Sequence, residues 1–159
     1  MRLLFVCTGN ICRSPMAAAI ARHLLDARGR GDVAVGSAGT AAWDGAPASE
    51  GAYLVALEHG LDLSGHRARQ VTSDLVADAD LVLGMSAHHV ERAESLGGAG
   101  RSHLLGAYAG RAADDAQVDD PFGGDLDEYR ATFDRLEALL QDAVARLPAP
   151  HGDADPSHD

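Results

Sequence analysis

Lysine is absent from this chain of 159 residues, so all 13 of its basic residues are arginine. Without lysine, Schiff-base catalysis, pyridoxal phosphate anchoring and a Walker A nucleotide loop ending in Lys-Ser or Lys-Thr are excluded. Arginine is therefore the side chain left to bind any anionic substrate.

Cysteine and long apolar runs are also scarce. The two cysteines, Cys7 and Cys12, are close in sequence, and a bridge between them would constrain little of the unfolded chain, so they are not a disulfide scaffold. No apolar run approaches the roughly 18 residues of a membrane span. The apolar start, residues 3–7, is shorter than the roughly 7 to 15 residues of a signal-peptide core. The sequence predicts a cytoplasmic protein with no membrane partner.

Basic side chains are outnumbered, at 13 against 24 acidic ones, which sets the formal net charge at -11. A chain of this sign repels nucleic-acid phosphates, so nucleic acid is not predicted as a partner. Hydrophobic residues make up 46% and charged residues 23%, near the average for globular proteins. We expect one domain over residues 1–147 and a disordered acidic tail over residues 148–159, which contain no large apolar residue.

Short apolar runs alternate with segments of helical period. Strands are predicted at 1–7, 33–38, 81–85 and 102–105, and helices at 14–28, 48–59, 86–96 and 126–147. Ser14 is the predicted N-cap of the first helix, with Pro15 at its first helical position. The last helix is predicted to bury one apolar face, formed by Leu126, Tyr129, Phe133, Leu136, Leu140 and Val144. This alternation predicts an α/β fold with an open four-stranded parallel sheet flanked by helices on both faces. Residues 107–124 have neither period and are predicted to be a functional loop.

The turn after the first strand carries the chemistry. Open parallel sheets bind ligands at the carboxyl ends of their strands, and Cys7 stands there, just before a helix. The amides and dipole of a helix N-terminus bind anions and stabilise a thiolate. Gly9 and Asn10 tolerate the left-handed backbone that a nest of amides needs, and Arg13 adds a planar fork for phosphate oxygens. The predicted phosphate-binding loop is Cys7, Thr8, Gly9, Asn10, Ile11, Cys12, Arg13 and Ser14.

Cys7, five intervening residues and Arg13-Ser14 near the N-terminus resemble the low-molecular-weight protein tyrosine phosphatases. Residues 37–40 with Trp43, 66–72 and 120–123 resemble the family's other motifs in their order. The resemblance implies an enzyme that hydrolyses phosphotyrosine in protein substrates, has the phosphate-binding loop after strand 1, and needs no metal or cofactor. A monomer or weak dimer is expected.

The resemblance also implies catalytic roles. Cys7 would be the nucleophile that forms a phosphocysteine, and Arg13 would hold the phosphoryl oxygens. Asp120 resembles the family's general acid, and the following Pro121 favours an extended Asp120 backbone. Ser14 resembles the hydroxyl that bonds the thiolate.

Supporting and pocket residues follow from the same resemblance. Asn10 and Ser37 resemble the network that fixes the loop, and a structural role is favoured for Ser37 and His66. Ile11, Trp43 and Phe122 are the predicted apolar walls of the substrate pocket. After the third strand, many family members have Met-Asp-x-x-Asn where this chain has Met85-Ser86-Ala87-His88-His89. A solvated helix face is the default prediction for His88 and His89, with His89 a candidate replacement for a loop-supporting residue.

Three other functions compete with this interpretation. Protein-arginine phosphatases share Cys-Thr-Gly-Asn and Asp-Pro-Phe-Gly-Gly with this chain, but they carry threonine where Ile11 stands, so phosphotyrosine is favoured. Arsenate reductases of this fold need cysteines beyond Cys12, which this chain lacks. A non-catalytic phosphoprotein-binding module is disfavoured by the intact Cys7, Arg13 and Asp120. Two roles are open for Cys12: a redox partner that forms a disulfide with oxidised Cys7, or a small packed side chain.

Overall fold

The computed structural model describes residues 1–150, so most of the predicted tail, residues 151–159, lies outside the described residues. Four parallel strands form one sheet in the order β2-β1-β3-β4: β1 (Arg2–Cys7), β2 (Ala34–Gly39), β3 (Leu81–Gly84) and β4 (Ser102–Leu104). The helices are α1 (Arg13–Ala27), α2 (Glu50–Glu58), α3 (Ser73–Asp78), α4 (Ala87–Ala93), α5 (Leu105–Tyr108) and α6 (Leu126–Ala145). The predicted open α/β sheet is confirmed.

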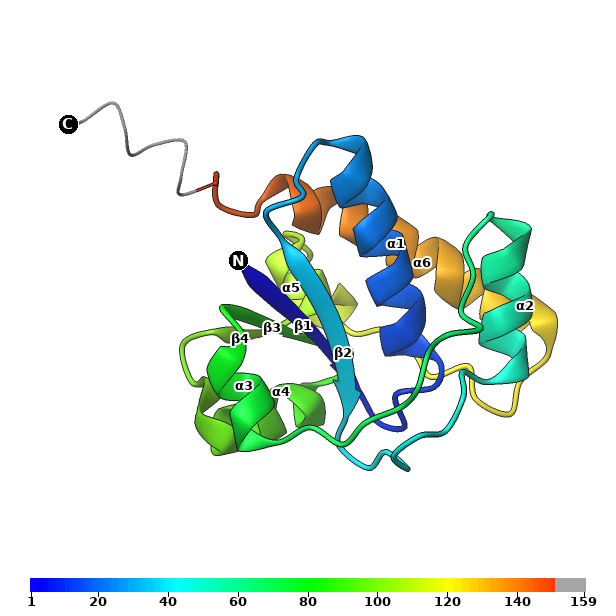
Figure 1. The fold of residues 1–159 in the computed structure, drawn as a ribbon, viewed down its shortest axis with the longest axis horizontal. Helices are drawn as coiled ribbons and strands as arrows, with labels where there is room; N and C mark the ends of the chain where they lie inside the picture. Colours follow the sequence, from blue (N-terminus) through cyan, green and yellow to red (C-terminus); the bar gives the residue numbers. More distant parts are fainter. Residues whose placement is uncertain (151–159) are drawn as a thin grey trace.

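Helices cover both faces of this sheet because alternate residues of the central strand point to opposite sides. Leu3 and Phe5 of β1 are buried in the larger core, which includes residues of α1 and α6. Leu4 and Val6 point to the other face and pack in a smaller core with residues of α3 and α4. Figure 1 shows α1 and α6 side by side on one side of the sheet, and α3 and α4 on the other.

The strand order places the end of β1 at a switch point. From β1 the chain crosses to β2 on one side, and β3 pairs with β1 on the other. Connections that leave in opposite directions open a crevice at the carboxyl ends of the two strands. The loop between β1 and α1, residues 8–12, lies at that crevice.

Ser14 is not the N-cap of the first helix, and Pro15 is not its first residue. Helix α1 begins at Arg13 after Cys12, so Ser14 and Pro15 lie inside its first turn. The hydroxyl of Ser14 instead contacts Cys7 and Asn10, a tertiary use that outweighs local capping. Proline remains compatible with the first turn because its missing N–H would have no intrahelical acceptor there.

Other boundaries also differ from the predicted ones. The apolar face of α6 is buried as predicted except for Leu126, which is 37% exposed at the start of the helix. Helix α4 stops at Ala93 and continues as a π turn, Glu94–Gly98, in which Gly97 has a φ of 104° that ends regular helix. The short helices α3 and α5 were not predicted, and α5 and a 3-10 turn, Ala113–Asp115, occupy part of 107–124. No helix within residues 1–150 is long and apolar enough to cross a membrane.

Candidate active site

Asn10 holds the phosphate-binding loop in shape. It is completely buried and is the only non-glycine residue with positive φ, 55°, among the described residues. Its Nδ2 donates to Ser14 Oγ at 2.8 Å and Ser37 Oγ at 2.9 Å, and its Oδ1 accepts from the backbone N–H of Arg69 at 3.0 Å. Its carbonyl lies 2.6 Å from His66 Nε2. The side chains predicted to support the loop thus meet at one residue.

The residues that follow β2 form backbone hydrogen bonds with the start of the phosphate-binding loop. The backbone N–H of Thr40 donates to the Cys7 carbonyl at 2.9 Å, and that of Ala41 donates to the Thr8 carbonyl at 2.9 Å. A side chain at Gly39 would collide with the Thr8 carbonyl, so only glycine fits at this position. Both strands therefore fix where the loop begins.

Cys7 Sγ lies 2.9 Å from Ser14 Oγ, and both residues are buried. Ser14 Oγ already accepts a hydrogen bond from Asn10 Nδ2, so its own proton is free to be donated to sulfur. A hydrogen bond in that direction stabilises a thiolate. The three residues form a chain of donors that ends on the candidate nucleophile.

Arg13 is anchored by its neighbours and is only 4% exposed. Its Nη1 donates to the Val118 carbonyl at 2.9 Å and to Ser86 Oγ at 3.3 Å. Its Nη2 lies 3.5 Å from Thr8 Oγ1 and 3.6 Å from Asp120 Oδ2. Arg13 Nε is buried and has no hydrogen-bond partner within residues 1–150.

One cavity of about 250 Å³ brings most of the predicted site residues together. It is lined by Cys7, Thr8, Gly9, Ile11, Cys12, Arg13, Asp120 and Phe122. Trp43 is not among these lining residues and is 86% exposed, so in this conformation it forms no wall of the cavity. Ile11 and Phe122 are apolar side chains in this lining, and Phe122 is 65% exposed.

The segment that carries Asp120 is tied down on both sides. Asp120 Oδ1 accepts from the backbone N–H of Phe122 at 3.0 Å, which fixes the turn after the aspartate. Upstream, the N–H of Val118 donates to the Met85 carbonyl at 2.8 Å, next to the end of β3. The carboxyl group is therefore held where β3 and the phosphate-binding loop meet.

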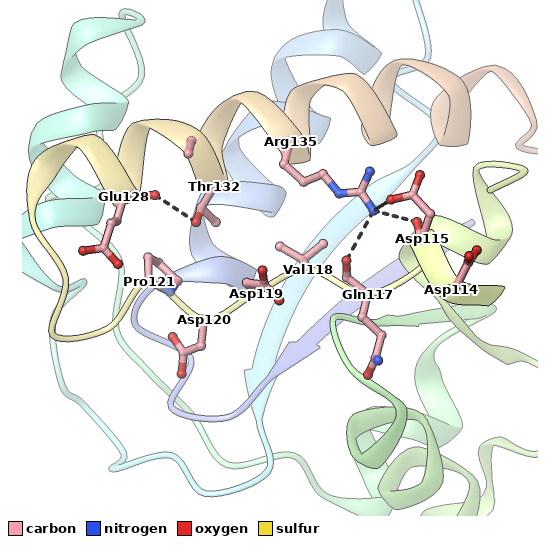
Figure 2. A pocket seen from close by; sticks show the side chains of 11 residues that line it. Asp114, Asp115, Gln117, Val118, Asp119, Asp120, Pro121, Glu128, Thr132 and Arg135 are labelled. Atoms are coloured by element: carbon pink, nitrogen blue, oxygen red, sulfur yellow. Dashed lines mark hydrogen bonds and ion pairs between the residues drawn. The ribbon is translucent and has the colours of Figure 1, made fainter. Parts of the chain in front are cut away.

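Arg135 on α6 is a further anchor that sequence reasoning missed. Its Nη2 donates to the carbonyls of Asp115 at 2.6 Å and Gln117 at 3.3 Å, and it lies 3.1 Å from Asp115 Oδ1. Figure 2 shows Arg135 reaching from the helix across a second hollow of about 580 Å³ toward the segment that continues to Asp120. No sequence motif signals this contact, because the partners are mainly backbone carbonyls.

Cys12 is buried and has two hydroxyl neighbours. Its Sγ lies 3.1 Å from Ser49 Oγ and 3.4 Å from Tyr129 Oη. Burial raises the pKa of the Cys12 thiol, although the hydrogen bonds from Ser49 and Tyr129 oppose this shift. Burial also raises the pKa of Tyr129 to about 12, helped by its contact with Cys12. Cys12 is therefore a neutral thiol at ordinary pH.

The family "Low molecular weight phosphotyrosine protein phosphatase" matches residues 2–150 of the chain. The chain is a member of this family. It is 38% identical over 141 residues to low molecular weight protein-tyrosine-phosphatase PtpB of Staphylococcus haemolyticus, which covers 88% of this chain and 95% of the relative. It is 36% identical over 146 residues to the protein-arginine-phosphatase of Geobacillus stearothermophilus, covering 92% and 95%.

The fold of this phosphatase matches a solved relative. The low molecular weight protein tyrosine phosphatase of T. tengcongensis superposes with a TM-score of 0.86 at 37% identity, over 92% of this chain and 99% of that one. The chain is thus a phosphatase of the low-molecular-weight type, an enzyme that hydrolyses phosphate esters, and its relatives include both tyrosine and arginine phosphatases.

The paired histidines of this phosphatase differ from each other. His88 is exposed, as a solvated helix face predicts, but His89 is completely buried, so that prediction is wrong for His89. His89 Nε2 lies 2.9 Å from Thr8 Oγ1, inside the phosphate-binding loop. The departure from the common family pattern after β3 is therefore accompanied by a direct contact with the loop.

Proposed function

We propose that this phosphatase hydrolyses phosphotyrosine in protein substrates through a phosphocysteine at Cys7. The proposal rests on one observation: Cys7, Arg13 and Asp120 line one small cavity that is also lined by the apolar side chains of Ile11 and Phe122. Nucleophile, phosphate-binding arginine and acid are thus within reach of one phosphoryl group, with apolar side chains where a phenol ring would lie.

The reaction has two steps. In the first, the Cys7 thiolate attacks phosphorus in line, the bond from phosphorus to the leaving oxygen breaks, and the Asp120 carboxyl group protonates that oxygen. In the second, the Asp120 carboxylate takes a proton from water, the water oxygen attacks phosphorus, and the sulfur–phosphorus bond breaks to restore the thiolate. Arg13 and the loop amides hold the equatorial oxygens through both steps.

Ile11 supports phosphotyrosine as the preferred substrate. Its side chain offers no hydrogen-bonding atom, so a guanidino group packed against it would lose water without gaining a partner there. A phenol ring would bury apolar surface against Ile11 and Phe122 at a gain of roughly 1 to 3 kcal/mol.

Phosphoarginine is the second candidate substrate. The second hollow, next to Asp120, is lined by carboxylates that attract a cationic leaving group, as Figure 2 shows for Asp114, Asp115, Asp119 and Glu128. The 36% sequence identity to a protein-arginine-phosphatase also supports phosphoarginine as a candidate substrate.

A matched pair of peptides separates the two candidates. Peptides of one sequence with phosphotyrosine or phosphoarginine at the same place are compared by kcat/KM. We expect the phosphotyrosine peptide to be hydrolysed faster, and Ile11→Thr to shift the ratio toward phosphoarginine. Leu57→Thr, at an exposed apolar residue of α2 outside the cavity, is the control and leaves the ratio unchanged. A wild-type enzyme that prefers phosphoarginine supports the second candidate instead.

A further inference from the structure

His89 is a buried polar residue whose two ring nitrogens both have partners. It is the third residue of α4, and its side chain is completely buried. The backbone N–H of Ser86 donates to His89 Nδ1 at 2.9 Å, and His89 Nε2 lies 2.9 Å from Thr8 Oγ1. The ring therefore connects the start of α4 to the phosphate-binding loop.

These contacts determine the protonation state of the ring. Because Nδ1 accepts a hydrogen bond, the proton of the neutral imidazole is on Nε2, which donates to Thr8 Oγ1. Burial, with the charges of His88 and Arg13, lowers the pKa of His89 to about 3, so the ring is neutral at ordinary pH. A neutral ring is a fixed donor to Thr8 and a fixed acceptor for Ser86.

The two residues held by His89 are both neighbours of Arg13. Thr8 Oγ1 lies 3.5 Å from Arg13 Nη2, and Ser86 Oγ lies 3.3 Å from Arg13 Nη1. The guanidinium is thus held between a residue of the loop and a residue at the start of α4. His89 sets the distance between these two residues without touching Arg13 itself through a hydrogen bond.

We propose that His89 is a positioning residue that aligns Arg13 for the phosphoryl group by holding Thr8 and Ser86 on either side of the guanidinium. The inference rests on the proposed function, in which Arg13 binds the equatorial oxygens. A small misplacement of such a group weakens transition-state binding more than it weakens the fold.

Three substitutions test the contacts of His89 with Ser86 and with Thr8 separately. His89→Gln keeps an acceptor for the Ser86 N–H and a donor long enough to reach Thr8. His89→Asn keeps the acceptor, but its shorter side chain does not reach Thr8. His89→Leu keeps neither. His23→Asn, at an exposed histidine of α1, is the matched control.

The readouts are kcat/KM for p-nitrophenyl phosphate and the inhibition constant of orthovanadate, both measured below the unfolding transition of every variant. We expect His89→Asn to lower kcat/KM and weaken vanadate binding by about tenfold each, and His89→Gln to stay within about threefold of wild type. His23→Asn is expected to change neither. A residue with only a structural role would lower the melting temperature and leave the vanadate constant of the folded enzyme unchanged, and that result would overturn the proposal.

A double-mutant cycle with Thr8→Val tests whether His89 positions Arg13 through its contact with Thr8. If His89 acts through Thr8, His89→Asn loses about tenfold in the wild-type background and less than twofold in the Thr8→Val background. Equal losses in both backgrounds would show that His89 does not act through Thr8. The wild-type protein tests the proposed function separately. If it neither hydrolyses p-nitrophenyl phosphate nor binds vanadate, the proposed function is wrong, whatever the His89 variants show.

Discussion

Arg13 and Asp120 form an ion pair in the lining of the cavity, with Arg13 Nη2 3.6 Å from Asp120 Oδ2. The arginine side chain is 4% exposed and the aspartate side chain is 49% exposed. The carboxyl group therefore has access both to a phosphoryl group held by Arg13 and to bulk water. A group that first protonates the leaving oxygen and then deprotonates water needs this position.

Substitution of Asp120 by asparagine removes the proton donor and keeps the shape of the side chain. We expect Asp120→Asn to slow hydrolysis of an alkyl phosphate by roughly 10² to 10⁴ and that of p-nitrophenyl phosphate by much less, since only the poor leaving group needs a proton. Asp119→Asn, at the exposed neighbour, is the control. Equal losses with both substrates would show that Asp120 is not the acid.

Arg135 provides a test of how the acid-bearing segment is held. We predict that Arg135→Gln lowers kcat/KM for an alkyl phosphate by about tenfold, because Asp120 loses its fixed position when the carbonyls of Asp115 and Gln117 lose their donor. Arg111→Gln is a matched control. Arg111 and Arg135 are each 29% exposed, and each forms an ion pair with a different aspartate, Asp142 and Asp115 respectively. If the two variants have the same activity, Arg135 does not position the acid.

Cys7 and Cys12 are both free thiols that line the same cavity, which allows a redox test. Peroxide converts the Cys7 thiolate to a sulfenic acid, and attack by Cys12 then forms a disulfide and releases water. Cys12→Ser should retain basal activity but fail to recover with thiol after peroxide. Because burial raises the pKa of Cys12, disulfide formation should be faster at higher pH, where more of the Cys12 thiolate exists. Equal recovery of both proteins would rule out this role.

His89 also predicts a pH dependence of stability. Its pKa is lowered from 6.5 to about 3 in the folded state, so the unfolded chain binds its proton first as the pH falls through 6.5. Stability is then lost on acidification, by about 2 kcal/mol between pH 6.5 and about pH 4.5. Urea unfolding of His89→Gln should show a correspondingly smaller loss than wild type. The same loss in both proteins would mean that His89 is not buried as a neutral ring.

The phosphate-binding loop could be predicted because its residues are adjacent in sequence. Cys7 and Arg13 belong to one strand–loop–helix unit. Asp120, distant in sequence, could be proposed as the acid because Pro121 and Phe122 directly follow it. His89 and Arg135 could not be assigned in this way, because their roles depend on contacts with Thr8, 81 positions away, and with backbone carbonyls.

The errors in the fold have the same cause. Ser14 has the residue type of an N-cap, but its hydroxyl is used by Cys7 and Asn10, which a local pattern does not contain. The family resemblance places Trp43 in the pocket, but Trp43 is exposed and is not among the residues that line the cavity. Helices α3 and α5 span six and four residues, too short for a helical period to be recognised.

Trapping the covalent intermediate shows whether Cys7 is the nucleophile. Asp120→Ala still permits attack on p-nitrophenyl phosphate, whose leaving group needs no acid, but slows hydrolysis of the phosphoenzyme because no base activates water. Rapid denaturation followed by intact-mass and peptide mass spectrometry should find one phosphoryl group on Cys7, and none in the same protein with Cys7→Ala. Turnover with no adduct, or with the phosphoryl group on another residue, would contradict the account.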